Sequence, residues 1–349
     1  MNFPKFLRPG DTIAIAAPSF GATTEPYITR FNDAVRQFKA RGYKVVTGEC
    51  CYKSDGLGIS TTPQVAAKEL MDFYLDPKID AIFSCGGGEL MCETTTYIDF
   101  ARLKKAQPKW FMGYSDNTNF IFALVTLSDT AAIYGQNAPG FGKPWEQSEL
   151  DAWNLLEGKN LTVCGYEKFQ SPDAESENPL SPYILTEKKV LTTYVPENGK
   201  LKKLAENETL TLSGTLLGGC LDCLVGLSGT RFDGVHSFNE THKKVLWVLE
   251  SCDYNPMDIR RALWHLRESG WFKNACGFII GRPLAAFGQE MMGVNAYNAV
   301  TGILGELNVP VIFDADVGHI DPAMPLIFGS NAEVTVKGND IKIDMGLTR

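Results

Sequence analysis

Short apolar runs alternate with segments of helical periodicity over the first 134 residues, and this alternation limits the possible folds most strongly. The runs are continuous, which is typical of strands buried on both faces of a sheet. The expected strands are Thr12–Ala17, Tyr43–Thr47, Ile79–Phe83, the residues leading into Ser115, and Ala131–Tyr134. The expected helices are Tyr27–Arg41, a helix starting at Thr62-Pro63, and Phe120–Leu127. This order predicts a parallel α/β sheet with helices on both faces, and ligands at the carboxyl ends of the strands.

A second α/β region begins near residue 208, after a segment of different character. Residues 165–207 are polar, turn-rich and weakly periodic, which indicates a connector. The strands expected beyond it are Thr209–Leu217, Lys244–Leu249, Gly277–Ile280, Val309–Phe313 and a closing hairpin of Ala332–Val336 with Ile341–Ile343. The expected helices are Cys220–Leu227, Pro256–Arg267 and Val294–Leu307. We therefore predict an N-terminal domain at 1–164, a connector at 165–207 and a C-terminal domain at 208–349.

Composition narrows the class of protein and its partners. Of the 349 residues, 44% are hydrophobic and 21% charged, as in soluble globular proteins. The net charge of −8 and a pI near 5.2 argue against nucleic acid or an anionic membrane as partner. No run has the length of a signal-peptide core or a membrane span. The nine cysteines are odd in number and scattered, so reduced thiols and a cytoplasmic location are expected.

No metal or other cofactor is expected. The four histidines and the scattered cysteines show no metal-ligand spacing. Cys220-Leu-Asp-Cys223 is a lone C-x-x-C without a second pair or a nearby histidine. This motif alone therefore predicts neither a zinc site nor a redox site.

Ser115 follows a short apolar strand and precedes a helix, within Gly113-Tyr114-Ser115-Asp116-Asn117. A serine at a strand-to-helix turn exposes its hydroxyl at the carboxyl edge of the sheet, next to helix N-terminal amides. The sequence matches the G-x-S-x-G elbow except at Asn117, so two interpretations stay open. Ser115 is either a nucleophile or part of a Ser-Asp-Asn helix cap.

A nucleophilic serine needs a base and a group that orients the base. His319 lies after an expected strand, where a catalytic histidine of an α/β protein belongs, although a surface-loop histidine would look the same. Glu250 ends a strongly apolar strand, so its carboxylate should be partly buried and needs a partner. That partner is either an imidazole or an arginine such as Arg260 or Arg261. Asp253 is the rival carboxylate.

The segment Ser84-Cys-Gly-Gly-Gly-Glu89 directly follows the third expected strand. Glycines at this position let backbone amides approach a ligand closely, as in an oxyanion hole or an anion cradle. The segment is neither a Walker loop nor a G-x-G-x-x-G fingerprint. A plain strand-to-helix turn is the remaining interpretation.

Six short motifs occur in an order that resembles the LD-carboxypeptidase family, the serine peptidase family S66. They are Arg8–Ser19, Gly86-Gly87, Gly113–Thr118, Gly218-Gly219, Leu249-Glu250 and Gly318-His319. The resemblance spans nearly the whole chain. It implies an N-terminal Rossmann-like (flavodoxin-like) parallel-sheet domain and a C-terminal mixed α/β domain with a small barrel-like sheet. It also implies a homodimer.

The resemblance assigns roles position by position. Ser115 matches the family nucleophile, Glu250 the orienting acid and His319 the base. The amides of Asp116 and of Gly86 or Gly87 match the oxyanion hole. The implied activity is hydrolysis of an amide or acyl-conjugate bond in a small peptide, without a metal or other cofactor.

The long separation between Ser115 and Glu250 is similar to that in the microcin-immunity (MccF-like) branch, which cleaves peptidyl or aminoacyl adenylates. The other branch cleaves LD-peptide bonds of murein fragments. The MccF-like branch stacks a connector tryptophan on the base, and this connector has only Tyr183 and Tyr194 for that role. Gly88 and Glu89 also differ from the branch's usual serine-asparagine ending, and are the other substrate-binding candidates. A non-catalytic α/β protein that binds an anion on Gly86–Gly88 is the rival class.

Overall fold

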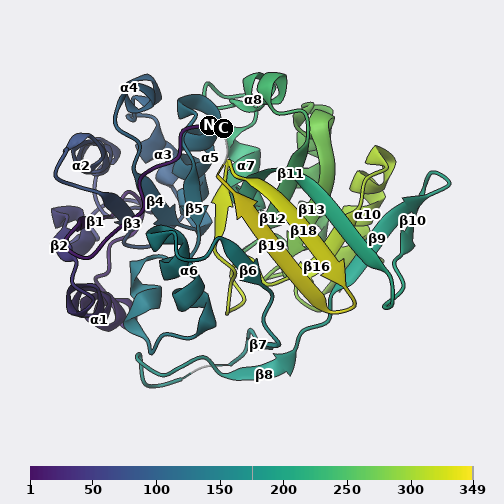
Figure 1. The fold of residues 1–349 in the computed structure, drawn as a ribbon, viewed down its shortest axis with the longest axis horizontal. Helices are drawn as coiled ribbons and strands as arrows, with labels where there is room; N and C mark the ends of the chain where they lie inside the picture. The colour runs from purple at the N-terminus through teal and green to yellow at the C-terminus, as the bar shows by residue number, and fades with distance from the viewer. Residues whose placement is uncertain (175, 348–349) are drawn as a thin grey trace.

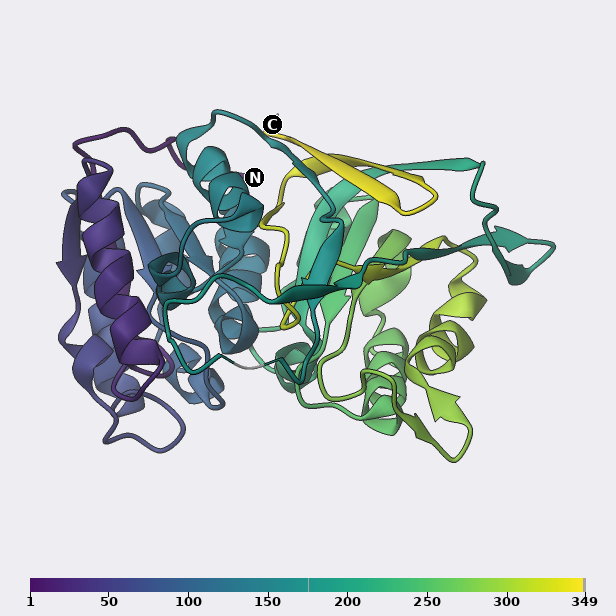
Figure 2. The same ribbon diagram turned by 90° about the horizontal axis from the view of Figure 1, so that it is seen from below.

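The computed structural model describes residues 1–174 and 176–347. Glu175 of the predicted connector and the last two residues of the predicted C-terminal range therefore lie outside the described residues. Two sheets with their helices lie side by side, the N-terminal one mostly purple to blue and the C-terminal one mostly teal to yellow in Figures 1 and 2. None of the helices in the described part of the chain is long and apolar enough to cross a membrane.

The first sheet has six strands in the order β17-β5-β4-β3-β1-β2. The strands are β1 (Thr12–Ala16), β2 (Lys44–Thr47), β3 (Ala81–Ser84), β4 (Trp110–Gly113), β5 (Ala132–Tyr134) and β17 (Leu326–Phe328). The parallel part, β2-β1-β3-β4-β5, has the flavodoxin-like order, which confirms the predicted fold class. β17 comes from the C-terminal part of the chain and pairs antiparallel with β5.

Helices cover both faces of this sheet, as the sequence predicted. They are α1 (Tyr27–Ala40), α2 (Pro63–Leu75), α3 (Met91–Thr95), α4 (Phe100–Lys105), α5 (Thr118–Ser128) and α6 (Gln147–Glu157). The helical spacing of Phe31 and Phe38 buries both side chains under α1. Pro63 occupies the first turn of α2, where a missing N–H costs nothing. Short 3₁₀ turns are η1 (Glu49–Tyr52), η2 (Ser115–Asn117) and η3 (Ala138–Gly142).

The second sheet has nine strands in the linear order β10-β9-β16-β13-β12-β11-β18-β19-β6. Their bounds are β6 (Thr162–Cys164), β9 (Thr192–Glu197), β10 (Lys200–Lys203), β11 (Thr209–Cys220), β12 (Val245–Glu250), β13 (Ala275–Gly281), β16 (Val311–Ala315), β18 (Asn331–Lys337) and β19 (Asp340–Gly346). The central strands β11, β12, β13 and β16 are parallel, and antiparallel strands flank them. The resemblance implied a small barrel-like sheet here, and the structure has an open mixed sheet.

Short helices and hairpins complete the second region. The helices are α7 (Leu221–Leu227), α8 (Val235–Thr241), α9 (Pro256–Glu268) and α10 (Ala296–Leu304), with 3₁₀ turns η4 (Trp271–Asn274) and η5 (Gly305–Leu307). Two hairpins lie outside the large sheets, β7 (Lys168–Gln170) with β8 (Leu185–Lys188) and β14 (Glu290–Met291) with β15 (Val294–Asn295). Asn255 caps α9 by accepting from two of its first amides.

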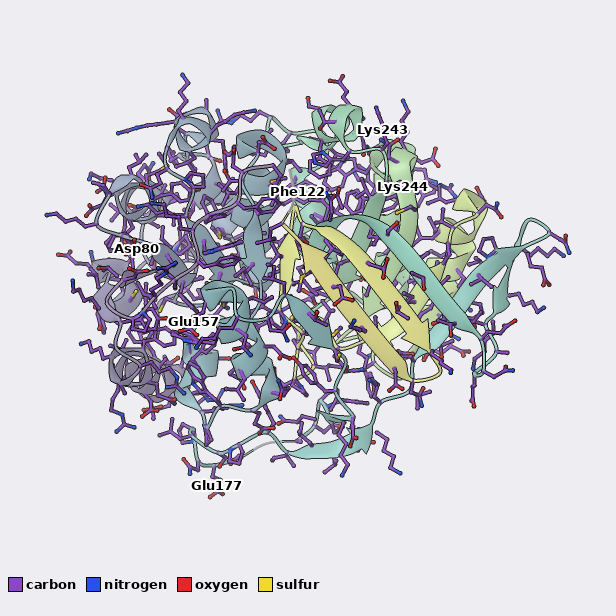
Figure 3. All side chains as sticks on the ribbon, in the orientation of Figure 1. Asp80, Phe122, Glu157, Glu177, Lys243 and Lys244 are labelled. Carbon is purple, nitrogen blue, oxygen red and sulfur yellow. The ribbon has the colours of Figure 1, made fainter. Side chains whose placement is uncertain are left out.

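The core is continuous between the two regions because α5 is buried along most of its length. Phe122 of α5 stacks on Trp271 with ring centroids 4.9 Å apart, and it also contacts Trp247. Figure 3 shows Phe122 in the interior, while charged side chains such as Glu177 and Lys243 lie at the periphery. A helix of the first region thus packs against aromatic residues of the second.

Sheet membership crosses the predicted division of the chain. Residues 165–207 contribute β9 and β10 to the second sheet, and β6, before residue 164, pairs with β19. β10 reads as a polar segment because Lys200-Leu-Lys-Lys203 forms the edge of the sheet, where charged side chains remain in water. The expected boundaries at 164 and 207 therefore separate strands that are hydrogen-bonded in one sheet.

Candidate active site

Ser115 lies at a sharp turn between β4 and α5. Its φ of 63° is in the left-handed region, which is rare for a residue with a side chain and marks backbone strain. Asn117 is the N-cap residue of α5, and no side chain caps this helix. The Ser115 hydroxyl instead lies 2.9 Å from Nε2 of His319. The helix-cap interpretation of Ser115 is therefore wrong.

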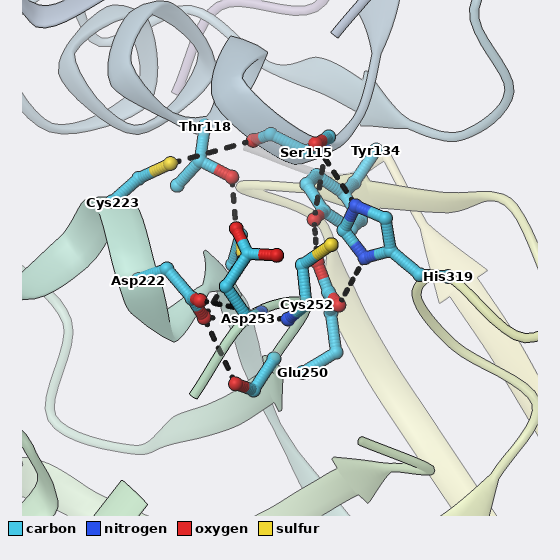
Figure 4. A network of polar contacts seen from close by, with 11 residues as sticks. Ser115, Thr118, Tyr134, Asp222, Cys223, Glu250, Cys252, Asp253 and His319 are labelled. Carbon is cyan, nitrogen blue, oxygen red and sulfur yellow. Dashed lines mark hydrogen bonds and ion pairs between the residues drawn. The ribbon is translucent and has the colours of Figure 1, made fainter. Parts of the chain in front are cut away.

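His319 lies in the loop that leads from β16 of the second sheet to β17 of the first. Its Nδ1 is 2.7 Å from Oε2 of Glu250 (Figure 4). A carboxylate only accepts hydrogen bonds, so Nδ1–H donates to Glu250 in the neutral imidazole. Nε2 is then the free acceptor for the Ser115 hydroxyl. The structure thus brings the three residues singled out from the sequence into one hydrogen-bonded row.

Glu250 ends β12 and is 2% exposed. Its Oε1 accepts a hydrogen bond from the hydroxyl of Tyr134 at 2.5 Å, and that hydroxyl accepts the backbone N–H of Ser115 at 3.2 Å. Arg260 and Arg261 bond to other groups, so the arginine salt bridge considered for Glu250 is not formed. Tyr134 was missed in the sequence, although it ends a buried strand with a polar group just as Glu250 does.

Glu250 and His319 are buried together, and each favours the charged form of the other. Burial alone would lower the pKa of His319, but the Glu250 carboxylate and the Cys252 side chain raise it well above its usual value. Burial alone would raise the pKa of Glu250. The positive charge of His319 and the hydrogen bonds from His319 and Tyr134 instead hold the pKa of Glu250 below its usual value. The site therefore favours an imidazolium next to a carboxylate, the state in which His319 has accepted a proton.

The glycine segment after β3 lies directly against Ser115. A Cβ atom at Gly87 would be 3.0 Å from the Ser115 hydroxyl oxygen, so a side chain at this position would crowd that hydroxyl. Within the described residues, the amides of Gly86 and Gly87 donate to no protein acceptor. Asn117 joins this segment to the elbow, because its side-chain amide donates to the Gly86 carbonyl at 2.9 Å. Asn117 thus has a structural purpose where the usual elbow has glycine.

Asp116 contributes to the architecture of the site through its side chain. Its buried carboxylate accepts from the Ser19 hydroxyl at 2.5 Å and from the Met91 amide at 2.9 Å. Burial raises the pKa of Asp116, and these hydrogen bonds oppose that rise. The carboxylate therefore ties together the loop after β1, the end of the glycine segment and the elbow.

Gly318 is the second position where glycine is required. Its φ is +104°, and a Cβ atom there would be 2.5 Å from Oε2 of Glu250. The loop can therefore bring His319 onto the carboxylate only with glycine before it.

A cleft of about 540 Å³ opens over Ser115 and His319. Gly88 and Glu89, predicted to bind substrate, line it, and so does Tyr183. Its other polar and charged lining residues include Tyr27, Arg30, Gln136, Asn137, Lys143, Cys252, Asp253 and Asp321. Burial and the nearby Asp253 carboxylate raise the pKa of Glu89. The cleft thus has a carboxylate pair, Glu89 with Asp253, and a pair of cations, Arg30 with Lys143.

The two connector tyrosines have different positions. Tyr183 is 8% exposed, its hydroxyl donates to Glu149 at 2.8 Å, and the Lys143 ammonium lies 4.2 Å from its ring centre. Tyr194 does not line the cleft, because it belongs to β9 and packs on Phe313 within the second sheet. The structure therefore does not support Tyr194 as a substrate-binding residue.

The described residues contain no group of three or more His, Cys, Asp or Glu side chains able to hold a metal ion. All nine cysteines are free thiols. Cys223 of the C-x-x-C lies beneath the elbow, with its sulfur 3.7 Å from the Ser115 carbonyl oxygen. Its position next to Ser115 could not be read from the motif.

Comparison with known proteins places the chain in a family. The profile of the LD-carboxypeptidase N-terminal domain matches residues 13–135, and that of the C-terminal domain matches residues 213–334. The chain belongs to the LD-carboxypeptidase family. The resemblance noted in the sequence is thereby confirmed, and with it the class of enzyme, serine peptidases of family S66.

Individual members of the LD-carboxypeptidase family match over almost their full lengths. A Treponema pallidum protein with a provisional carboxypeptidase name is 30% identical over 97% of this chain and 94% of its own. The microcin C7 self-immunity protein MccF of Escherichia coli is 24% identical over 97% of this chain and 94% of its own. Among solved structures, MccF with aspartyl sulfamoyl adenosine has a TM-score of 0.76 at 20% identity, covering 98% of each chain. A muramoyltetrapeptide carboxypeptidase from Oxalobacter formigenes has a TM-score of 0.69 at 20% identity, covering 96% of this chain and 98% of its own.

Proposed function

We propose that the chain hydrolyses an amide or acyl-conjugate bond of a small peptide with a Ser-His-Glu triad. Ser115 is the nucleophile, His319 the general base and Glu250 the group that orients the imidazole. The observation that carries this proposal is the hydrogen-bonded row, with 2.9 Å between Ser115 and His319 and 2.7 Å between His319 and Glu250. These contacts give each residue the partner that its role requires.

In the first half-reaction the Ser115 oxygen attacks the substrate carbonyl carbon while its proton moves to Nε2 of His319. The negative charge that develops on the carbonyl oxygen is stabilised by the amides of Asp116 and of Gly86 or Gly87. The imidazolium then gives its proton to the leaving group, the bond to that group breaks, and an acyl-Ser115 ester remains. The buried Glu250 carboxylate stabilises the imidazolium during this step.

In the second half-reaction water replaces the leaving group. His319, neutral again, takes a proton from the water as it attacks the ester carbonyl. Return of that proton to the Ser115 oxygen releases the carboxylic acid product and restores the enzyme. No metal or other cofactor takes part in this scheme.

Replacement of Ser115 tests the proposed mechanism directly. Ser115→Ala should lower kcat by several orders of magnitude, because triad members act as a unit, with little change in melting temperature. A fluorophosphonate probe should label the unaltered enzyme at Ser115 and leave this variant unlabelled. Near-normal turnover in Ser115→Ala would refute the mechanism.

The rival function is binding of an anion on Gly86–Gly88 without catalysis. It requires no contact between Ser115 and His319, and the strained Ser115 backbone would then have no purpose. A chain that binds ligands but resists the fluorophosphonate would support this rival.

Two classes of substrate are proposed for this cleft. One is a murein peptide, as cleaved by a muramoyltetrapeptide carboxypeptidase, and the other an aminoacyl nucleotide, as bound by MccF. Lys143 covers the ring of Tyr183, which weakens the case for Tyr183 as a stacking platform. A parallel assay of a murein tetrapeptide ending in D-alanine and an aminoacyl sulfamoyl-adenylate distinguishes the classes.

The expected assembly and location stay part of the proposal. A homodimer is implied by the family and is measured by light scattering. A cytoplasmic location is in keeping with nine free thiols, since disulfides are rare in reducing compartments. The acidic composition still argues against nucleic acid or membrane as partner.

A further inference from the structure

Lys143 is a buried cation that forms no ion pair with any residue in the described part of the chain. It follows η3, at the carboxyl edge of the first sheet, and its side chain is 8% exposed and lines the cleft. Within the described residues, its ammonium group makes no hydrogen bond and no ion pair, and it lies 4.2 Å from the centre of the Tyr183 ring. Burial lowers the pKa of Lys143, because removal of water disfavours its charge.

Lys109 is a buried lysine whose ammonium group is paired with backbone carbonyls. Lys109 is 3% exposed, and its ammonium donates to the carbonyl oxygens of Asp76 and Ile79 at 2.5 Å each. These bonds replace the water that Lys109 has lost. Lys143 has no such replacement from the protein, so its donors are directed at whatever occupies the cleft.

Arg30 adds a second positive charge next to Lys143. It lies on α1, and α1 packs closely on η3, where a Cβ atom at Gly142 would be 1.9 Å from the Arg30 carbonyl oxygen. The Arg30 side chain donates one hydrogen bond, to the Pro179 carbonyl at 2.7 Å, and also lines the cleft. The charge of Arg30 further lowers the pKa of Lys143. Two neighbouring cations thus face the same cavity.

Among the nearby carboxylates, Asp321 also lines the cleft and compensates part of the charge of these two cations. Asp321 attracts Lys143 but forms no ion pair with it in the described structure, and it accepts from Gln136 at 2.9 Å. Glu149 and Glu146 lie behind the lysine, outside the lining of the cleft, and Tyr183 donates to both. An anion that enters the cleft is repelled by Glu89 and Asp253 and attracted toward Lys143 and Arg30, whose two positive charges exceed the one negative charge of Asp321 beside them.

We propose that Lys143 and Arg30 form the subsite for an anionic group of the substrate, a peptide carboxylate or a phosphate ester. The inference rests on the proposed function, because it assumes that the cleft over Ser115 holds the scissile bond. It supplies the cation that carboxylate recognition requires and that the sequence did not reveal. The Tyr183 ring holds the lysine in position through a cation–π contact, while Glu149 anchors the tyrosine.

The test measures equilibrium binding to the full chain carrying Ser115→Ala, so that no probe is consumed. One pair of probes is a murein tetrapeptide ending in D-alanine and its C-terminal carboxamide, and the other pair is adenosine monophosphate and adenosine. We expect at least one anionic probe to bind about tenfold or more tightly than its neutral partner, the scale of one charge-assisted hydrogen bond. Lys143→Gln should reduce that preference to about twofold or less, while Lys143→Arg should retain most of it.

Controls separate this subsite from folding and from the proposed chemistry. Lys39→Gln removes the same charge from the exposed face of α1 and should leave every affinity unchanged. Melting temperature and affinity for the neutral probes show that Lys143→Gln is folded. The probe pair in which the anionic member binds more tightly shows whether the subsite takes a carboxylate or a phosphate. An anion preference that survives Lys143→Gln, or none in either pair, overturns the proposal, whereas failure of the unaltered chain to react with fluorophosphonate overturns only the triad.

Discussion

The charge state of His319 determines the pH dependence expected at the scale of single residues. His319 must be neutral to accept the Ser115 proton, and its pKa lies well above the ordinary imidazole value of about 6.5. Turnover should therefore rise with pH through a limb above pH 6.5, and fall as pH drops through it. A pH–rate profile of kcat/KM checks this, and a flat profile down to about pH 4 would contradict an imidazole base.

Glu250→Gln separates this explanation from a general effect of pH. The amide removes the negative charge that raises the pKa of His319, so the acid limb should move to lower pH. Turnover should also fall by about 10²–10⁴-fold, because the imidazolium loses its stabilising partner. An acid limb that stays at the same pH would show that another group titrates.

Tyr134 is expected to position the row of catalytic groups. Tyr134→Phe removes the donor to Glu250 and the acceptor for the Ser115 amide. We expect kcat to fall about 10- to 100-fold with KM nearly unchanged, and unfolding free energy to fall by about 1–3 kcal/mol. The matched control is Tyr297→Phe, which removes a 2.7 Å hydroxyl–carboxylate bond to Asp314 outside the cleft. Equal effects of the two variants on kcat would argue against a positioning role.

At the scale of elements, the approach of the glycine segment to the elbow is the sensitive feature. Gly87→Ala places a methyl group about 3.0 Å from the Ser115 oxygen, in the space that an attacked carbonyl needs. We expect kcat/KM to fall about 10²–10³-fold, the scale of losing an oxyanion-hole donor. Gly226→Ala is the control, since a Cβ atom there meets nothing within 4 Å on α7. If Gly87→Ala were as active as this control, the glycine segment after β3 would have no part in catalysis.

The elements that carry Ser115, Glu250 and His319 could be predicted because each ends in a local signal. An apolar run that stops at a polar residue marks the carboxyl end of a buried strand, as at Ser115 and Glu250. Each residue thus lies at the carboxyl end of parallel strands, Ser115 after β4 of the first sheet and Glu250 at the end of β12 of the second, and packing of the two regions brings them together. The same signal at Tyr134 predicts a polar group there, but a tyrosine ending a strand is common enough to be overlooked.

The features that could not be predicted depend on contacts between distant segments. β17 has three residues between Pro325 and Gly329, too few to show a period. β9 and β10 lie in a turn-rich segment, and they join the sheet only because β9 pairs with β16 and β10 pairs with β9. Tyr194 therefore could not be excluded from the cleft on sequence alone. Lys143 was missed for the same reason, since its burial results from α1 and Tyr183.

At the scale of the whole molecule, the two regions should unfold as one. Ile327 of β17 is fully buried in the first sheet, and β17 belongs to the C-terminal half of the chain. Ile327→Ala should cost about 2–5 kcal/mol, as for other buried aliphatic side chains. In this variant, hydrogen exchange should show that the amides of β1 and those of β12 lose protection by similar amounts. Loss confined to the first sheet would mean that the regions unfold independently.

The position of β17 also sets an order of events during synthesis on the ribosome. β5 is complete at Tyr134, but the strand that covers its edge is made only when translation reaches Leu326. At about 5–20 residues per second, the edge stays open for roughly 10 to 40 seconds. A nascent chain is therefore exposed to strand addition and chaperone capture during that interval. His319 emerges just before β17, so a nascent chain that has not reached this residue has the proposed nucleophile but lacks the proposed base.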